Sequence, residues 1–474
     1  MALILRRSRN APRGRYTPNL WPVWLVAPLA LVVVGALSFG LYHGVYALLS
    51  DASAGQTPRK PVNINDVIKT TATVLTLIGA VLAGLYAYRK QLLAEGDARR
   101  ADASQLADRY TTAAEQLGDD QAAVRLAGVY ALARLADDWE EQRQVCIDVL
   151  CAYLRMPYEP DPTAPEHRAG EREVRHTIIR VIRDHLQTPD ASTAWCRHRL
   201  DFTGAVFDSV NFSASHFQGT VTFDGATFSG AEVDFNGATF SGRLVRFDGA
   251  TFSGAEVTFE RATFSGGGQV RFDGAMFSGR TVRFERTTFS GGGQVYFARA
   301  MFSGGQVYFT DATFSGGQVR FDGATFSSGQ VYFARAMFSG AEVEFTGAMF
   351  SGAEVYFTDA TFSSGGVYFD SATFSSGEVH FARATFSGGG VQFFGAMFSG
   401  AEVYFIGATF SSGQVYFARA MFSSGEVHFA RATFSGGTIT FVGSTLRGGT
   451  VTFVGATFSG TAFDWGPLPV PAGA

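Results

Sequence analysis

Two long apolar runs lie near the start of the chain. Residues 20–49 read LWPVWLVAPLALVVVGALSFGLYHGVYALL, without an acid, Lys or Arg, and residues 67–88 are similarly apolar, with Lys69 near one end. A helix needs about 20 such residues to cross a bilayer. The first run is too long for a signal peptide and a second run follows it, although cleavage near Ala54 is an alternative. The pattern predicts two transmembrane helices, at 20–49 and 67–88.

Basic residues in the flanks predict the orientation of these helices. The flank at 1–19 carries five Arg, the stretch after the second run carries four Arg or Lys, and the connection at 50–66 carries only Arg59 and Lys60. This asymmetry predicts a multi-pass protein of the cell membrane, with both termini in the cytoplasm and an extracytoplasmic loop at 50–66.

Residues 89–190 have a helical pattern. The polar sequence after Arg89 lacks Pro, so the second span is expected to continue as one helix and to stop at Gly118. AAVRLAGVYALARLADD and QRQVCIDVLCAYLR repeat apolar residues at helical spacing, and REVRHTIIRVIRDHL ends before Pro189. Glu115, Arg125 and Asp137 form a possible partner-binding set, against the simpler explanation that they are solvated charges of helix faces.

From Leu200 onward the chain is periodic. Phe202, Phe207, Phe212 and Phe217 are spaced by five, and later units read VxFxG ATFSG plus two residues, with a period of twelve. In an extended chain, positions two apart point to the same side, so Val or Ala and the next Phe face inward and the residue between them faces outward. Five residues per side and two enlarged corners predict a four-sided coil that contains two of these units. A flattened coil that contains a single unit is the alternative.

The array resembles the pentapeptide-repeat family, with Phe at the middle position and a small residue two before it. The resemblance implies a right-handed quadrilateral parallel β-helix over 200–463, of about eleven coils, followed by a tail at 464–474. Residues 109–155 also resemble a helical module of actinobacterial membrane proteins that carry pentapeptide repeats. The expected fold class is mixed: two transmembrane helices, a small cytoplasmic helical segment and this solenoid.

Composition and charge add few candidates for chemistry. The net charge is −4, and the three Cys form no spaced framework, which favours a reducing compartment. The Ser after each Phe has no His or Asp arranged beside it, and His380 and His428 lie four units apart, so both are interpreted as surface residues. We therefore expect no enzyme, no catalytic or metal-binding residues, no cofactor and no small-molecule substrate.

The outward position between Val and Phe is Tyr in seven units. With two units in each coil, Tyr308, Tyr332 and Tyr356 stack on one face, with His380 and Tyr404 next. Exposed aromatic stripes mark binding sites, so Tyr308, Tyr332, Tyr356 and Tyr404 are a candidate partner-binding face. Cross-strand pairing of a good strand former is the simpler explanation.

These patterns favour a membrane-anchored, non-catalytic rod that binds or scaffolds another protein on the cytoplasmic side. The expected partners are the lipid bilayer and a protein, without nucleic acid. One alternative is a DNA mimic that binds the topoisomerase gyrase, but 21 acids and 14 Arg are mixed from Leu200 onward. The second is an accessory subunit of a transporter or enzyme, which the lack of an intramembrane carboxylate disfavours.

Overall fold

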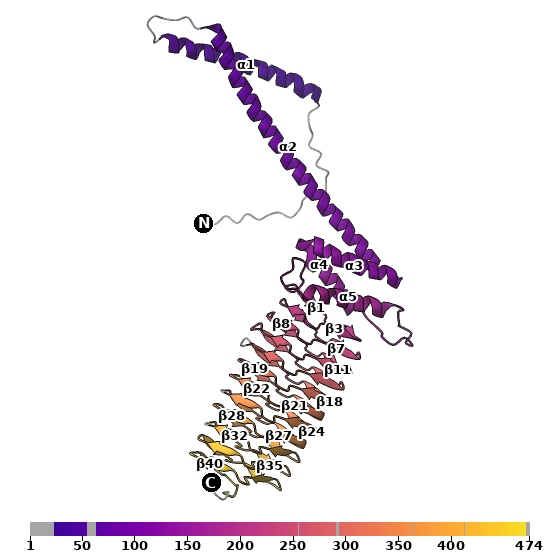
Figure 1. The fold of residues 1–474 in the computed structure, drawn as a ribbon, viewed down its shortest axis with the longest axis vertical. Coiled ribbons are helices and arrows are strands. Elements are labelled where there is room, and N and C mark those ends of the chain that lie inside the picture. Colours follow the sequence, from indigo (N-terminus) through magenta and orange to yellow (C-terminus); the bar gives the residue numbers. More distant parts are fainter. Residues whose placement is uncertain are drawn as a thin grey trace. The chain divides into compact units, whose positions relative to one another are not determined.

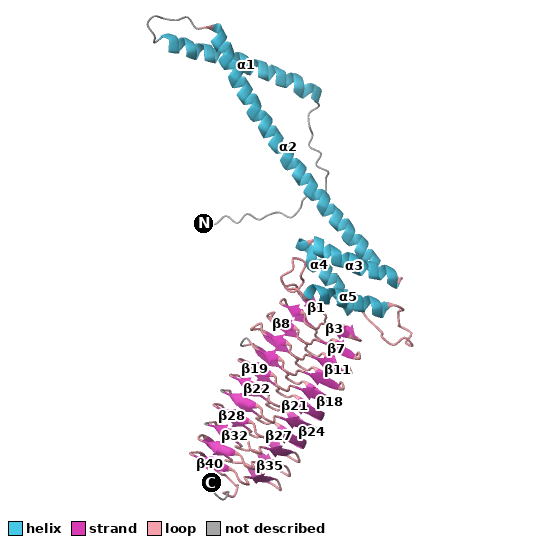
Figure 2. Cartoon of the chain, in the orientation of Figure 1, coloured by secondary structure: helices cyan, strands magenta, loops and turns pink. Residues whose placement is uncertain are grey.

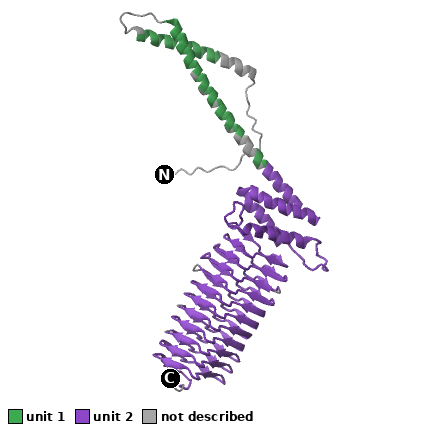
Figure 3. Ribbon diagram, viewed as in Figure 1, with its two compact units in different colours: residues 1–104 green, residues 105–474 purple. Residues whose placement is uncertain are grey.

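The computed structural model describes residues 23–54, 63–254, 256–290, 293–363, 365–411 and 413–470. The chain divides into two compact units, residues 1–104 and residues 105–474 (Figure 3). Where described, the first unit is helical, and the second combines helices with a long stack of short strands (Figure 2).

The first unit contains the two apolar segments. Helix α1 is Val23–Ala54, and α2, Ile64–Leu117, begins in this unit and continues into the second. Within the described residues, Val32–Ala52 and Ile64–Gln91 are long and apolar enough to cross a membrane. The expectation of one helix from the second apolar run to Gly118 is confirmed.

The helices extend into the connection expected at 50–66. Residues 51–54 continue α1, and α2 starts at Ile64, where the backbone N–H of Asn65 donates to Oδ1 of Asn63 at 3.0 Å. Asn is a favoured residue at a helix start because its side chain accepts such bonds. Residues 20–22 of the first predicted span lie outside the described residues.

The second unit begins with a small helical cap. After the end of α2 come α3 (Ala122–Asp138), the short η1 (Glu140–Gln142), α4 (Arg143–Arg155) and α5 (Glu171–Leu186). These match the helices that the sequence predicts, but the buried face of α3 is rotated. Arg125 and Gly128 are buried on it, whereas the apolar Ala127 is exposed. A Cβ on Gly128 would lie 2.6 Å from the backbone N of Leu117, so Gly allows α3 to approach α2 closely.

The array from β1 (Leu200–Asp201) to β41 (Ala462–Asp464) is a β-solenoid of parallel strands (Figure 1). Most turns have four strands, and in the middle coils the second and third are continuous as one eight-residue strand. The first lies in a 12-stranded sheet, the second and third in an 18-stranded sheet and the fourth in an 11-stranded sheet. Between β18 (Met301–Tyr308) and β21 (Thr325–Tyr332), Tyr308 pairs with Tyr332, two repeat units further along the chain. The coil of two units is therefore confirmed, and the alternative of one unit is wrong because a turn of that length supplies only two strands.

Some coils are shorter or longer than the regular period, and the difference in length lies at the corners, so the strands stay in register. In the first coil Leu200 pairs with Val221, and where an extra Gly is present Phe264 pairs with Phe289. The enlarged corners that the sequence predicts are also present: the register shifts between Phe302 and Gln306, and Gly305 and Gly317 have positive φ values of 56° and 83°. The same left-handed conformation recurs at other corners in Arg, for example Arg335 with φ 56°.

Stacked Phe rings fill the interior. Phe333 is fully buried and stacks on Phe309 and Phe357, with ring centroids 4.7 and 4.8 Å away. Val331 is also buried, and Tyr332 between them is partly exposed. The predicted alternation of inward and outward positions is therefore confirmed, and the spacing equals the distance between hydrogen-bonded strands.

The helical cap contacts the first coil of the solenoid, α4 against β1 and α5 against β3 (Val210–Asn211). Asp208 connects the two parts. Its carboxylate accepts from Tyr158 at 2.9 Å, from Arg172 at 2.6 Å and from His176 at 2.8 Å. Burial raises the pKa of Asp208, but these hydrogen bonds outweigh it and hold the pKa well below its usual range. The apolar core is thus continuous from the helices into the strands.

Candidate partner-binding face

One outward column of the 18-stranded sheet is a ladder of stacked rings. Strands β18 and β21, which carry its first two rings, are labelled in Figure 1. Neighbouring centroids are 4.7–5.2 Å apart and the rings are nearly parallel. The members of this ring ladder are Tyr308, Tyr332, Tyr356, His380, Tyr404 and His428. The structure therefore brings the four predicted Tyr onto one face, although His380 separates Tyr404 from the other three.

A second column runs beside the ladder, two residues earlier in each strand. Its members are Gln306, Gln330, Glu354, Glu378, Glu402 and Glu426, and each receives a hydrogen bond from the ring of its own coil or pairs with it. The hydroxyl of Tyr356 donates to Glu354 at 2.7 Å, and Nε2 of His380 lies 2.8 Å from Glu378. We call this set the amide–carboxylate column.

Hydrogen bonds also link the coils along this column. Nε2 of Gln306 donates to Gln330 at 3.0 Å, and Nε2 of Gln330 donates to Glu354 at 2.8 Å. Bonds from Tyr356 and Gln330 lower the pKa of Glu354. Burial and the Glu354 carboxylate raise the pKa of Tyr356, so at neutral pH the pair consists of a phenol and a carboxylate. The column is therefore a set of oriented acceptors.

Distinct groups lie at the two ends of the ladder. The guanidinium of Arg283 lies 5.9 Å from the ring centroid of Tyr308, on the preceding coil. At the other end, Nδ1 of His428 lies 2.9 Å from the hydroxyl of Thr452. Inside the stack each ring covers its neighbours, so the ladder presents ring edges and polar tips to solvent.

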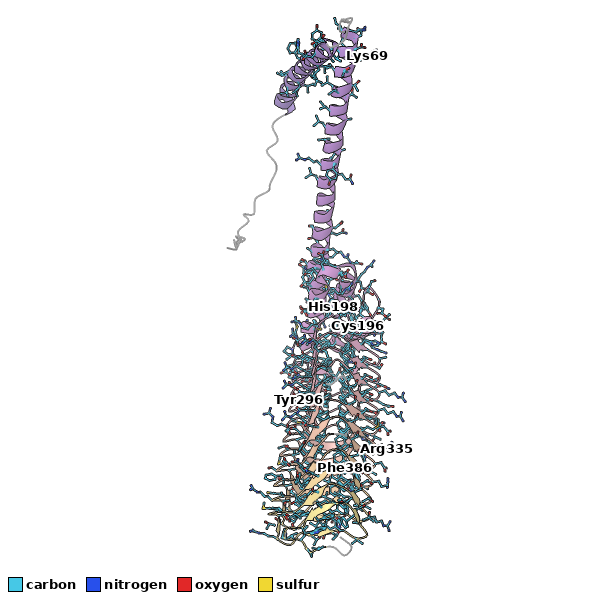
Figure 4. The ribbon with its side chains drawn as sticks, turned by 90° about the vertical axis from the view of Figure 1, so that its left-hand side faces the viewer. Lys69, Cys196, His198, Tyr296, Arg335 and Phe386 are labelled. Carbon is cyan, nitrogen blue, oxygen red and sulfur yellow. The ribbon has the colours of Figure 1, made fainter. Side chains whose placement is uncertain are left out.

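The other Tyr of the repeats do not form a ladder. Tyr296 lies on the 12-stranded sheet (Figure 4), in register with Arg271 and Arg320, and Tyr368 lies between Glu344 and Gln392 in the same column. Because charged or amide side chains alternate with them, no two of these rings are adjacent within the described residues.

The structure separates the three charged residues proposed in the helical segment. Arg125 is fully buried, where its guanidinium donates to the carbonyls of Asp119 and Asp120 and lies 3.3 Å from Glu171. Asp137 pairs instead with His185 at 3.2 Å, and Glu115 is exposed. The interpretation of Arg125 as a solvated charge is wrong, because carbonyls and a carboxylate compensate its burial.

The cysteines are buried and free. Burial raises the pKa of Cys146 to about 11 and that of Cys151 to about 12, so both remain thiols at neutral pH. Cys196 is also buried, and both it and His198 are labelled in Figure 4. Nδ1 of His198 lies 3.1 Å from Oε1 of Gln144. Across the part of the chain that is described, no group of three or more His, Cys, Asp or Glu is arranged to hold a metal ion.

The ladder extends further than the sequence argument predicted. His380 was expected between Tyr356 and Tyr404, but His428 was interpreted only as a surface residue, and it stacks on Tyr404. A step of one coil from Tyr404 leads to each His. The same counting from Glu354 gives Glu378, Glu402 and Glu426, so the signal was present in the sequence.

The comparisons agree with this architecture. The family described as pentapeptide repeats (9 copies) matches residues 223–269, which lie within the early coils. No curated protein and no solved structure matches the chain. The matched stretch of the array is thus similar to pentapeptide repeats.

Proposed function

We propose that this pentapeptide-repeat solenoid is a non-catalytic, membrane-anchored rod that binds another protein through its ring ladder. The observation that carries the proposal is the ladder itself, six partly exposed rings in one column whose polar tips are held by the adjacent side chains. Tyr is enriched at protein interfaces because it offers a rigid apolar body and a polar tip.

The stacked coils support this role by fixing the ladder in place. Each ring is attached to a strand whose neighbouring inward residues, such as Val331 and Phe333 beside Tyr332, are fully buried. A partner therefore meets a surface that needs little further ordering, and a smaller entropic cost favours binding. Stacking alone also explains why Tyr recurs, so the proposal requires a test on the ladder itself.

Membrane anchoring is the second part of the proposal. Two helices of suitable length and apolarity support it, and so does the excess of Arg and Lys in their outer flanks. Such an anchor holds the solenoid on the cytoplasmic side of the membrane, where a partner is a cytoplasmic or membrane protein.

Site-specific photo-crosslinking tests the binding face. Benzoylphenylalanine replaces Tyr332 on the ladder or, as a matched control, Thr385 on the 11-stranded sheet, and native membranes are irradiated. We expect a discrete protein adduct from position 332 and none from position 385. The same adduct from both positions, or from neither, would contradict the assignment of the face.

The DNA-mimic alternative makes a separate prediction. A DNA mimic needs an unbroken acidic surface, but Arg335 pairs with Asp311 and Arg383 with Asp359 at 2.7 Å, which interrupts the negative charge. The purified chain should not inhibit supercoiling by gyrase or shift duplex DNA at low salt. Stoichiometric inhibition of supercoiling would replace the protein-binding proposal with the mimic.

A further inference from the structure

Many acidic side chains of the solenoid are paired with Arg of a neighbouring coil. On the 12-stranded sheet, Arg246 lies 2.6 Å from Asp224, and Arg271 lies 3.2 Å from Asp248. At a corner, Arg335 lies 2.7 Å from Asp311. The chain thus compensates acid columns with Arg at positions one coil away.

The distal half of the amide–carboxylate column departs from this rule. Glu354, Glu378, Glu402 and Glu426 are direct register partners on four successive coils. Among the described residues, no Arg or Lys forms an ion pair with any of them. Glu378 and Glu426 contact instead the imidazoles of His380 and His428, at 2.8 and 3.0 Å, and their side chains are 46% and 48% exposed. Like charges directly opposite one another on a sheet repel, so these coils carry an electrostatic cost that no Arg or Lys offsets.

The surroundings of these carboxylates leave room for cations. Only Ser, Gly and Ala occupy the preceding corners, and the residues after the inward Phe are Thr358, Ala382, Ile406 and Ala430. The charged residues at the following corner are Asp359 and Arg383, which form an ion pair at 2.7 Å, and Arg431 in the coil of Glu426. A cation approaching the column therefore meets four carboxylates, with Arg431 as an opposing charge at the corner of the last coil.

The rings orient the carboxylates but do not compete for a cation. Tyr356 and Tyr404 donate their hydroxyl protons to Glu354 and Glu402, which leaves further acceptor sites on each carboxylate. The ring faces cover one another, so they are closed to cation–π contact inside the stack. Recognition at this face consequently depends on ion pairs and on apolar contact with ring edges.

We infer that the ladder face binds an extended, Arg- or Lys-rich segment of its partner protein, an inference that rests on the proposed function. The four carboxylates follow the solenoid axis at steps of about 4.8 Å and span about 14 Å, which about five residues of extended chain match. Their spacing in a line suits a segment with several cationic side chains better than one compact cation. The alkyl stems of Arg and Lys pack on ring edges while their charged ends reach the carboxylates.

Peptide binding to the full chain in micelles of an uncharged detergent tests the inference. The probe is a fluorescein-labelled peptide of alternating Arg and Ser, with a peptide of alternating Glu and Ser for comparison, and anisotropy is read at about 50 mM and about 500 mM salt. The variant is E378Q/E402Q. Gln is already accommodated in this column at Gln306 and Gln330, where it accepts from the Tyr hydroxyl, so the substitution preserves the fold. The matched control, E140Q/E141Q on η1, removes the same charge elsewhere.

We expect the native chain to bind the Arg–Ser peptide at low salt and to release it at high salt. E378Q/E402Q should bind about fivefold to tenfold more weakly, as expected for the loss of two surface ion pairs, and the control should change less than about twofold. Lack of binding by the native chain, equal binding of the Glu–Ser peptide, or equal weakening in variant and control would overturn the inference. Photo-crosslinking from position 332 detects a partner of any charge, so it separates this failure from that of the proposed function.

Discussion

Replacing Phe333 by Ala tests the stacked core most directly. Phe333 is fully buried, stacks on rings 4.7 and 4.8 Å away, and meets Phe321 edge-on at 5.7 Å. A buried Phe→Ala change costs about 3–5 kcal/mol, because it removes apolar burial and leaves a cavity. The coils above and below are held by their own strands, so we expect little collapse into the space and a cost toward the upper end.

Tyr332→Ala is the matched control on the same strand. Its ring also stacks on both sides, at 4.9 and 5.0 Å, and its hydroxyl donates to Gln330 at 2.7 Å. Because the side chain is partly exposed, its loss removes cross-strand contacts worth about 1 kcal/mol each at most and creates no cavity. The two substitutions should therefore differ by about 2–4 kcal/mol in local stability.

Hydrogen–deuterium exchange of the full chain in detergent measures this difference. For Phe333→Ala, amides of β21 and of the coils directly above and below should lose protection by a factor of about 30 to 1,000 relative to Tyr332→Ala. The first coils, at β5 (Val221–Thr222), should be unaffected, because each coil contacts only its neighbours. Equal loss of protection in the two variants would refute the inward and outward assignment, and uniform loss along the array would refute the nearest-neighbour argument.

Three further predictions follow from single features of the chain. Asp208→Asn should weaken the packing of α5 on the first coil by about 2–3 kcal/mol, measured as faster hydrogen–deuterium exchange in α5. Because the folded-state pKa of Asp208 is depressed, its contribution to stability should be constant at neutral pH and should decline only as the pH falls below about 4. A decline near pH 7 would contradict this assignment. Gly305→Ala should destabilise its corner much more than Gly237→Ala. Both residues have φ near +60°, but a Cβ at Gly305 would lie 2.1 Å from the carbonyl O of Arg280, whereas a Cβ at Gly237 would face open space. Similar hydrogen–deuterium exchange rates in the two variants would argue against a steric origin. In intact cells, a membrane-impermeant thiol reagent should label Ser53→Cys but not Thr385→Cys, and the reverse labelling would invert the proposed topology.

The repeats made most of the solenoid predictable. Spacings of five and twelve between Phe residues fixed the side length and the coil, so the stacking of Tyr308 on Tyr332 followed from counting alone. The helices of the cap were also predictable from their apolar patterns, because Gly118 precedes α3 and Pro157, Pro160, Pro162 and Pro165 separate α4 from α5. Periodic sequence determines periodic structure well when each turn contacts only the next.

Features that depend on contacts between different elements were not predictable. Arg125 lies on the buried face of α3 because carbonyls of the turn between α2 and α3 and Glu171 on α5 converge on it, and none of these is visible in a helical pattern. The three partners of Asp208 come from the cap, 32 to 50 residues away in the sequence. Arg335 adopts a left-handed φ that favours Gly, and its ion pair with Asp311 helps to compensate for that conformation.

The strict register also determines how the array can change in length. Removal of two repeat units deletes one turn, shortens the solenoid by about 4.8 Å, and leaves every later side chain on its original face. Removal of a single unit shifts all later units by half a turn. The distal residues of the ring ladder would then lie in the column that contains Tyr296 and Arg320. Two shortened proteins that differ by one unit would thus present opposite sides to a bound partner, and only insertions or deletions in whole turns preserve a continuous recognition surface.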